Sequence, residues 1–328
     1  MAGEAPVLEV RDLTISVRLR GGRRATVVDN VAFAIPAGGT VGLVGESGSG
    51  KTMTSLAIMG LLPPGARIDS GEIRLAGENL VGKSQGDLQR IRGRRMAMVM
   101  QDAMTALDPS YTIRSQLAPS LHQHRKLSGG ALQAAVANSL EQVQLPSTVE
   151  KQYPHQLSGG MRQRATSAIA LAGEPRLLIA DEPTTALDVT TQAHYLKLLR
   201  ELQAETGFAL LLVTHDLLVV RHVCQRVVMM YAGQVVEEGP VADVFDRPQH
   251  PYTRALIGAI PVLGETVELT SIEGQAPDSS EILPGCRFEP RCAFRRPVCA
   301  QMRPELTLRD GSRRARCFGT EPGGWIAP

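Results

Sequence analysis

The sequence has few aromatic residues and almost no excess of charge. Phe, Trp and Tyr make up 4% of its 328 residues, and the formal net charge is +2. Proteins that bind single-stranded nucleic acid stack the bases on aromatic side chains. A strongly basic surface is the other common way to attract a polyanion. Because both features are missing, we expect no nucleic-acid partner.

The sequence also lacks a long hydrophobic run and a secretion signal. Its most apolar stretch, residues 208–213, is far shorter than the roughly 20 residues of a membrane-spanning helix. The start, MAGEAPVLEV, has no basic region followed by an apolar core. We therefore expect a protein of the cytosol, or one that another protein holds at the cytosolic face of a membrane. Disulfides are rare in that reducing compartment, so the five cysteines are poor disulfide candidates.

The residues that are present suit a globular protein of more than one domain. The hydrophobic fraction is 43% and the charged fraction is 21%, as in ordinary folded proteins. Residues 7–19, 26–35 and 40–44 are rich in β-branched side chains and predict strands. Residues 112–173 predict helices, whereas apolar strands alternate with helices from 176 to 237. This order favours an α/β core with a mainly parallel sheet and a helical insert.

A glycine-rich loop at residues 45–52, GESGSGKT, carries the first recognisable chemistry. It follows the strand at 40–44 and precedes a helix predicted from Lys51 to Leu62, which is the context that a phosphate-binding loop requires. The glycines let successive backbone amides face phosphate oxygens, and the helix N-terminus adds a partial positive charge. Lys51 then reaches the β- and γ-phosphates, and the Thr52 hydroxyl ligates Mg²⁺. The expected ATP-binding residues are Gly45, Glu46, Ser47, Gly48, Ser49, Gly50, Lys51 and Thr52.

Two carboxylates end the apolar strand LLIADE at residues 177–182. Asp181 is expected near the Mg²⁺ shell, because open α/β sheets bind ligands at the carboxyl ends of their strands. Glu182 is placed to polarise the attacking water in ATP hydrolysis. Acidic residues after a strand also serve as helix caps. The next helix is expected to begin at Asp188, so capping accounts for Asp188 better than for Asp181.

A second glycine-rich segment, LSGGMRQR at residues 157–164, opens a predicted helix. A serine and glycines at a helix start form another anion-binding nest, and one nucleotide does not need two nests in one chain. Together with the motifs above, this segment resembles the signature of ABC ATPases. The resemblance implies a head-to-tail dimer in which each signature caps the γ-phosphate held by the other subunit. The signature residues are Ser158, Gly159, Gly160 and Met161.

Three further positions match the same family. Gln101 matches the Q-loop, which contacts Mg²⁺ or water and links to the membrane subunit. Asp188, in the tripeptide ALD, matches the D-loop, and His215, directly after a strand, matches the switch histidine. The resemblance thus implies Glu182, His215 and Gln101 as catalytic residues. It implies Thr52, Gln101 and Asp181 as Mg²⁺ ligands.

Two stretches depart from a simple match. A second LSGG occurs at residues 127–130, but it lacks the following RQR. We predict a plain helix N-cap there, with the Ser128 hydroxyl accepting a backbone hydrogen bond. Members of the family also stack adenine on an aromatic side chain, whereas residues 18–24, RLRGGRR, contain none. Either an arginine plane substitutes by stacking, or the base is held loosely.

Three longer stretches resemble one branch of the family, the oligopeptide, dipeptide and nickel importer ATPases. They are residues 99–109, 153–161 and 247–256, which read VMQDAMTALDP, YPHQLSGGM and RPQHPYTRAL. The resemblance covers essentially the whole chain and implies a bacterial protein at the cytoplasmic face of the inner or plasma membrane. It implies a second, different ATPase subunit, two permease subunits and an extracytoplasmic solute-binding protein. The expected function is ATP hydrolysis that powers peptide uptake, with a nickel or metallophore importer, or a soluble non-transport ABC ATPase, as alternatives.

The resemblance also implies the architecture. We expect a P-loop ABC ATPase core, which combines a RecA-like parallel sheet with an antiparallel β subdomain, over residues 1–261. A helical subdomain is expected at about 102–173 within it. Residues 262–328 are expected to form a small C-terminal extension, whose last part, from 282 onwards, is loop-like.

Four of the five cysteines lie in that extension. Cys286, Cys292, Cys299 and Cys317 have the spacing C-x5-C-x6-C-x17-C, which lacks the tight pairs usual in structural zinc sites. Residues 285–292, GCRFEPRC, resemble the tail of dipeptide importer ATPases, where such cysteines hold a [4Fe–4S] cluster. Zinc and free thiols remain the alternatives. Cys224 lies apart and is expected to be a buried helical thiol.

The same extension is basic. Residues 282–328 contain nine Arg and four acidic residues, so their net charge is +5 and that of the rest is −3. The arginines either offset an anionic cluster and donate hydrogen bonds to its sulfur atoms, or contact anionic lipid, or form a solvated basic face.

Overall fold

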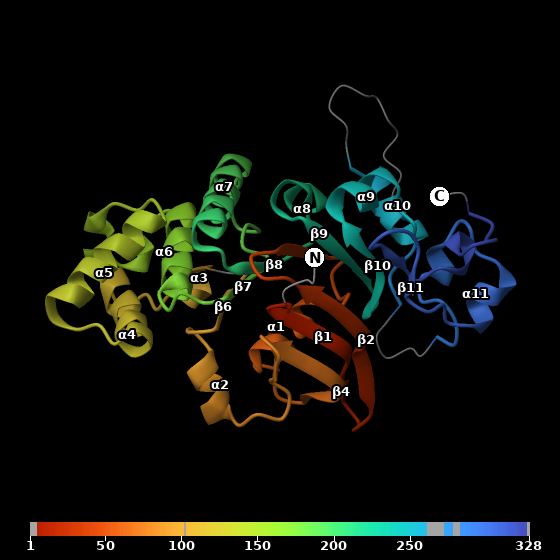
Figure 1. Ribbon diagram of the computed structural model, residues 1–328, viewed down its shortest axis with the longest axis horizontal. Helices are drawn as coiled ribbons and strands as arrows, with labels where there is room; N and C mark the ends of the chain where they lie inside the picture. Colours follow the sequence, from red (N-terminus) through yellow and green to blue (C-terminus); the bar gives the residue numbers. More distant parts are fainter. Residues whose placement is uncertain (1–4, 102, 261–271, 278–282, 327–328) are drawn as a thin grey trace.

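Two β-sheets and the helices packed on them form most of the molecule (Figure 1). The computed structural model describes residues 5–101, 103–260, 272–277 and 283–326. The smaller sheet is antiparallel, with strand order β2-β1-β4-β5. Its strands are β1 (Leu8–Arg18), β2 (Arg24–Ile35), β4 (Ala66–Leu75) and β5 (Glu78–Asn79).

The larger sheet has the order β11-β12-β10-β9-β3-β8-β7-β6. The five strands from β9 to β6 pair in parallel, and the other three add antiparallel. The strands are β3 (Thr40–Val44), β6 (Met96–Val99), β7 (Leu177–Asp181), β8 (Ala209–Thr214), β9 (Arg226–Tyr231), β10 (Gln234–Pro240), β11 (Thr307–Leu308) and β12 (Arg314–Ala315). The expected RecA-like parallel sheet with an antiparallel β subdomain is confirmed.

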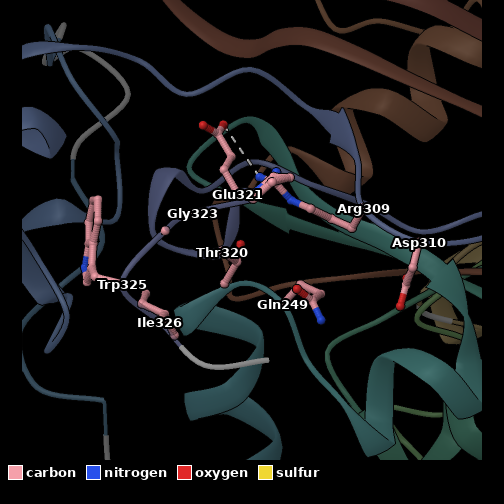
Figure 2. A pocket seen from close by; sticks show the side chains of 10 residues that line it. Gln249, Arg309, Asp310, Thr320, Glu321, Gly323, Trp325 and Ile326 are labelled. Carbon is pink, nitrogen blue, oxygen red and sulfur yellow. Dashed lines mark ion pairs between the residues drawn. The ribbon is translucent and has the colours of Figure 1, made fainter.

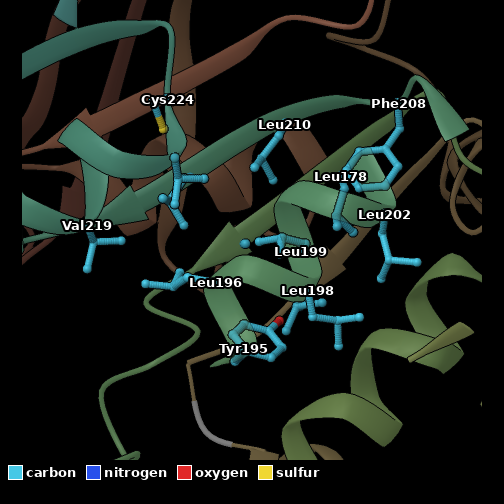
Figure 3. Close-up of a cluster of buried hydrophobic side chains, with 14 of the residues drawn as sticks. Leu178, Tyr195, Leu196, Leu198, Leu199, Leu202, Phe208, Leu210, Val219 and Cys224 are labelled. Atoms are coloured by element: carbon cyan, nitrogen blue, oxygen red, sulfur yellow. The ribbon is translucent and has the colours of Figure 1, made fainter. Parts of the chain in front are cut away.

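The main sheet separates two hydrophobic cores. Side chains alternate between the faces of a strand, so Leu210 and Leu212 of β8 lie in one core while Leu211 and Val213 lie in the other. The first core packs against α7 (Val189–Thr206), where Leu199 faces the sheet (Figure 3). The second core includes α1 and the small sheet. Burial on both faces explains why β3, β7 and β8 are continuous apolar runs.

The helix that follows the phosphate loop is α1 (Lys51–Met59). It ends before the expected Leu62, because Gly60 adopts the left-handed conformation (φ 65°) and its amide bonds back to Ala57 and Leu56. This is the usual glycine stop of a helix. A further short helix, α2 (Gln85–Ile91), precedes β6.

A group of helices lies between β6 and β7 in sequence and at one end of the molecule (Figure 1). Its members are α3 (Ala103–Ala106), α4 (Ile113–Arg125), α5 (Gly129–Gln142), the 3₁₀ turns η1 (Ser147–Lys151) and η2 (Pro154–Gln156), and α6 (Gly159–Leu171). Buried Leu117, Leu121, Val136 and Leu140 join them to the first core. These helices therefore share the first core with α7.

The C-terminal part of the chain lies at the opposite end (Figure 1). Its helices and turns are α9 (Val241–Asp246), α10 (Pro251–Gly258), η3 (Glu289–Arg291), α11 (Pro297–Gln301) and η4 (Phe318–Thr320), whereas α8 (Leu217–Val223) lies near the middle of the molecule. None of the helices in the described ranges has the length and apolarity to cross a membrane.

The last residues are not merely loop-like, since β12 pairs with β10 and thereby extends the main sheet. Two-residue strands leave no periodic pattern, so the sequence did not predict them. Beside them, the Arg313 side chain is 2% exposed and donates to the carbonyls of Asp243 and Arg247 at 3.0 and 2.7 Å. The extension is thus tied to the core by backbone and side-chain bonds.

Four arginines of the basic extension have side chains that are largely shielded from solvent. The exposed fraction is 13% for Arg287, 7% for Arg291, 4% for Arg309 and 2% for Arg313. Their carboxylate partners are, in the same order, Asp29, Glu46, Glu321 and Asp310. A uniformly solvated basic face was therefore wrong for these positions, where positive charge is used to bind acidic groups.

Candidate active site

The phosphate loop connects β3 to α1 and has the conformation that its glycines require. Gly48 and Gly50 adopt left-handed φ angles of 78° and 97°, which cost little only for glycine. A Cβ atom at Gly45 would lie 2.1 Å from the Met230 carbonyl oxygen. Any larger residue at position 45 would therefore push the loop away from β9.

Lys51 lies inside this loop. Its Nζ donates to the carbonyl oxygens of Gly45 and Glu46 at 2.7 and 3.0 Å. Burial lowers the pKa of Lys51, while the carboxylates of Glu182, Asp181 and Glu46 oppose that shift. The two carbonyl oxygens therefore fix the ammonium group within the loop, at the position expected to bind the β- and γ-phosphates.

Asp181 and Thr52 form a place suited to Mg²⁺. Asp181 is 4% exposed, and its Oδ1 is buried without a hydrogen-bond partner. Burial raises the pKa of Asp181 to about 6, even though a hydrogen bond from Thr52 and the charge of Lys51 lower it. A buried carboxylate oxygen with a free lone pair, next to a hydroxyl, is the donor set that a hard cation prefers. These residues fit the expected ion.

Glu182 is held by three side chains. Its Oε1 lies 3.2 Å from His215 Nδ1. Its Oε2 accepts hydrogen bonds from Gln101 Nε2 at 3.2 Å and from Thr185 Oγ1 at 2.9 Å. The backbone of Glu182 has a φ of 45°, a strained conformation for a residue with a side chain. The contacts and the strain together fix the carboxylate direction.

One pocket of about 680 Å³ brings Lys51, Thr52 and Glu182 together, whereas Asp181 does not line it. Its walls are Val27, Ser47, Gly48, Ser49, Gly50, Lys51, Thr52, Met53, Gln101, Glu182 and His215. Two expected ATP-binding residues, Gly45 and Glu46, are not among them. The Glu46 amide instead donates to Tyr252 Oη at 3.0 Å, and its carboxylate pairs with Arg291 at 2.9 Å. No sequence pattern pointed to Arg291 or Tyr252 here.

The predicted signature lies outside this pocket, at the start of α6. The Ser158 hydroxyl accepts from the Met161 amide at 3.3 Å. Gly160 packs closely on α7, since a Cβ there would lie 2.4 Å from Thr191 Cγ2. Asp188 caps α7 by accepting from the amides of Thr190 and Thr191. The predicted signature and Asp188 are thus joined through Thr191, and neither lines the pocket of the phosphate loop.

The other LSGG segment corrects one expectation. Ser128 is the N-cap of α5, but its side chain accepts no capping hydrogen bond. Ser128 is extended (φ −149°), whereas Ser158 has a φ of −65°. Gly129 then turns the chain through a left-handed φ of 57°. The first amides of α5 therefore do not face the Ser128 hydroxyl.

The four C-terminal cysteines gather around a second, small pocket. Cys286, Cys292, Cys299 and Cys317 all line it. Burial, strengthened by the neighbouring thiols, raises the pKa of Cys286 to about 12 and that of Cys292 to about 11. Yet within the described residues no three His, Cys, Asp or Glu side chains are arranged to hold a metal ion. The donor chemistry fits a cluster or zinc, but this arrangement does not.

One further expectation concerns Cys224. Cys224, at the end of α8, is 8% exposed, and burial raises its pKa to about 12, so it is the buried thiol expected. Figure 2 shows a further pocket of about 550 Å³ in the C-terminal part, where Arg309 and Glu321 form an ion pair at 3.7 Å. That pocket contains none of the phosphate-binding residues.

Comparisons with known proteins identify the same family that the motifs of the site indicate. A model of the ABC transporter family matches residues 28–185, and one of the oligopeptide/dipeptide transporter C-terminal region matches residues 236–299. The dipeptide transport ATP-binding protein DppD of Bacillus subtilis (strain 168) is 46% identical over 316 residues, which are 95% of this chain and 94% of that protein.

Two solved structures share the fold. The ATP-binding cassette MJ0796, in a dimeric post-hydrolysis state with ADP and Pi, has a TM-score of 0.64 at 28% identity, over 71% of this chain and 98% of that one. The protein cbiO1 of Clostridium perfringens, part of an ABC transporter complex, has a TM-score of 0.65 at 26% identity, over 74% and 92%. With the phosphate loop, Asp181 and Glu182 in place, these matches establish that the chain belongs to the ABC transporter family and is an ATPase.

Proposed function

We propose that this chain hydrolyses ATP to drive the uptake of di- and oligopeptides by an ABC importer. The observation that carries the proposal is one pocket that joins the phosphate loop to Gln101, Glu182 and His215. The match to the oligopeptide/dipeptide transporter C-terminal region supports the transport role. The name of the Bacillus subtilis relative, a dipeptide transport ATP-binding protein, supports peptides as the solute.

Six polar side chains of the site have a proposed part in hydrolysis. Lys51 and the amides of the phosphate loop bind the phosphates. Glu182 orients and polarises the attacking water, because hydrolysis of a phosphoanhydride depends mainly on positioning and charge stabilisation. His215 and Gln101 hold the Glu182 carboxylate from two sides, each at 3.2 Å. Thr52, Asp181 and Gln101 would hold Mg²⁺, which neutralises the β- and γ-phosphate charge when bound.

The site is proposed to be completed by a second ATPase subunit, different from this chain. Ser158, Gly159, Gly160 and Met161 lie outside this chain's own pocket and would cap ATP on that partner. The dimeric state of the similar cassette MJ0796 supports the arrangement. The partner's signature would cap the ATP held here.

We further propose that the pair drives two permease subunits at the cytoplasmic face of a bacterial membrane. An extracytoplasmic solute-binding protein would deliver the peptide. The division into residues 1–261, with helices at about 102–173, and an extension at 262–328 remains our proposal. A nickel or metallophore importer of the same branch is the alternative.

For the cysteines, we propose a [4Fe–4S] cluster held by Cys286, Cys292, Cys299 and Cys317, with zinc as the alternative. The support is that all four line one pocket, although their present arrangement is not that of a metal site. Iron, labile sulfide and zinc are to be measured after anaerobic purification, together with the absorption spectrum. About four irons and four sulfides per chain support the cluster, and zinc or no metal contradicts it.

Transport is tested in cells that lack this chain. Uptake of a radiolabelled dipeptide and of radioactive nickel is measured side by side after the wild-type chain or a Glu182→Gln variant is supplied. The proposal predicts that the wild-type chain alone restores dipeptide uptake. Restoration of nickel uptake without dipeptide uptake would favour the alternative, and nucleic-acid-stimulated hydrolysis without permeases would contradict transport altogether.

A further inference from the structure

The segment between Cys286 and Cys292 is bound to the ATPase core at several points. Arg287 donates to the Ala232 carbonyl and pairs with Asp29 of β2. Phe288 is 3% exposed and packs against the rings of Tyr231 and Tyr252, at centroid distances of 5.2 and 5.6 Å. These contacts fix the backbone of the segment against β9, α10 and the turn after β9.

Arg291, in the same segment, reaches the phosphate loop itself. Its Nη1 lies 2.9 Å from Glu46 Oε2 and 3.3 Å from Tyr231 Oη. Its Nε and Nη2 donate to the carbonyls of Glu273 and Ile272 at 3.0 and 3.3 Å. Only 7% of the Arg291 side chain is exposed. Because four hydrogen bonds hold its guanidinium, the group can fix the position of the Glu46 carboxylate.

Glu46 is held through three of its atoms. Arg291 binds the carboxylate, the Tyr252 hydroxyl accepts from the amide at 3.0 Å, and Lys51 Nζ donates to the carbonyl at 3.0 Å. Because Lys51 is the phosphate-binding lysine, a shift of Glu46 also moves a hydrogen-bond partner of that lysine. Glu46 does not line the nucleotide pocket, so any effect of its side chain on ATP acts through the loop's shape.

We propose that Arg291 is a positioning residue for ATP binding: through Glu46 it holds the phosphate loop in its nucleotide-binding shape. The segment between the two cysteines is then a structural support of the nucleotide site. The proposed role of Arg291 concerns the ATP site and does not depend on which solute the importer carries.

A purely structural role for Arg291 would look different in experiment. If it served only to attach the extension, its loss would lower the stability of the chain without a selective effect on ATP. A positioning role acts through one carboxylate, so removing either partner should have the same consequence. Removing both should then be no worse than removing one.

The test uses the full-length chain with Arg291→Gln, Glu46→Gln and the double variant. The matched control is Arg295→Gln, because Arg295 follows Cys292 closely in the sequence, but its side chain is 59% exposed and lies as far as 3.8 Å from its partner Glu289. Equilibrium binding of a fluorescent ATP analogue gives Kd, and the reconstituted importer gives KM and kcat. Thermal unfolding reports on stability.

We expect each single variant to raise Kd and KM about tenfold, equivalent to about 1.4 kcal/mol, with kcat within about twofold. The double variant should match the single variants, and Arg295→Gln should bind ATP like the wild type. An unchanged Kd, additive losses in the double variant, or an equal loss in Arg295→Gln would overturn the proposal. If Arg291→Gln does not fold, Glu46→Gln decides alone, and an unchanged Kd in that variant overturns it.

Discussion

Replacing Gly160 by alanine probes the contact between the signature helix and α7. The added Cβ would lie 2.4 Å from Thr191 Cγ2, and its next neighbour, Thr191 Cβ, is at 3.9 Å. The Thr191 methyl cannot simply rotate away, because Thr191 Oγ1 donates to Asp188 Oδ2 at 2.6 Å. Forcing an extra methyl into a packed contact costs about 1–3 kcal/mol, and Ala gains up to about 1 kcal/mol over Gly in a helix. Gly160→Ala should therefore destabilise the chain by up to about 2 kcal/mol.

The same substitution in a chain that also carries Thr191→Ser gives the sharper test. Thr191→Ser removes Cγ2 but keeps the hydroxyl that binds Asp188. In that background the clash is gone and only the helix preference remains, so Gly160→Ala should stabilise by a few tenths to about 1 kcal/mol. The assay is urea unfolding of the four chains, with free energies compared in a cycle. A Gly160→Ala effect of the same sign and size in both backgrounds would refute the proposed contact.

Two further predictions concern single side chains. Burial raises the pKa of Asp181 to about 6, so above that pH the folded state holds a charged carboxylate at a free-energy cost that the unfolded state does not have. Without nucleotide or Mg²⁺, Asp181→Asn should raise the free energy of unfolding at pH 8 by roughly 1–3 kcal/mol. That gain should shrink as the pH falls from about 6 towards 4, and a pH-independent difference would contradict it. Ser158→Ala should cost about 1 kcal/mol because it removes a real cap. The same change at Ser128, which makes no cap bond, should cost less than about 0.5 kcal/mol, and equal losses would count against this distinction.

The chemistry of the site was predictable because it follows from motifs at strand ends. The loop after β3, Glu182 after β7 and His215 after β8 come from three neighbouring parallel strands. The carboxyl ends of such strands meet at one edge of a sheet. Their convergence in one pocket is therefore a consequence of topology, which apolar runs and glycines reveal in the sequence.

What could not be predicted depends on contacts between distant residues. Glu46 and Arg291 lie 245 positions apart, and no local pattern pairs a loop glutamate with an arginine of the extension. The strand β4 was also missed, because Ser70 and the left-handed Gly71 interrupt its alternation. The two LSGG segments show the limit most clearly, since identical residues produce a capped helix at Ser158 and an uncapped one at Ser128.

The role of Glu182 tests the central claim most directly. ATP hydrolysis by the reconstituted importer is to be compared for the wild-type chain, Glu182→Gln and Glu205→Gln, the last being an exposed glutamate of α7. Binding of MgATP is measured in parallel. If Glu182 orients the attacking water, Glu182→Gln should bind MgATP normally but hydrolyse it about 10²–10⁴-fold more slowly, while Glu205→Gln behaves as wild type. Hydrolysis by Glu182→Gln within about twofold of the wild-type rate, with all subunits assembled, would contradict the account.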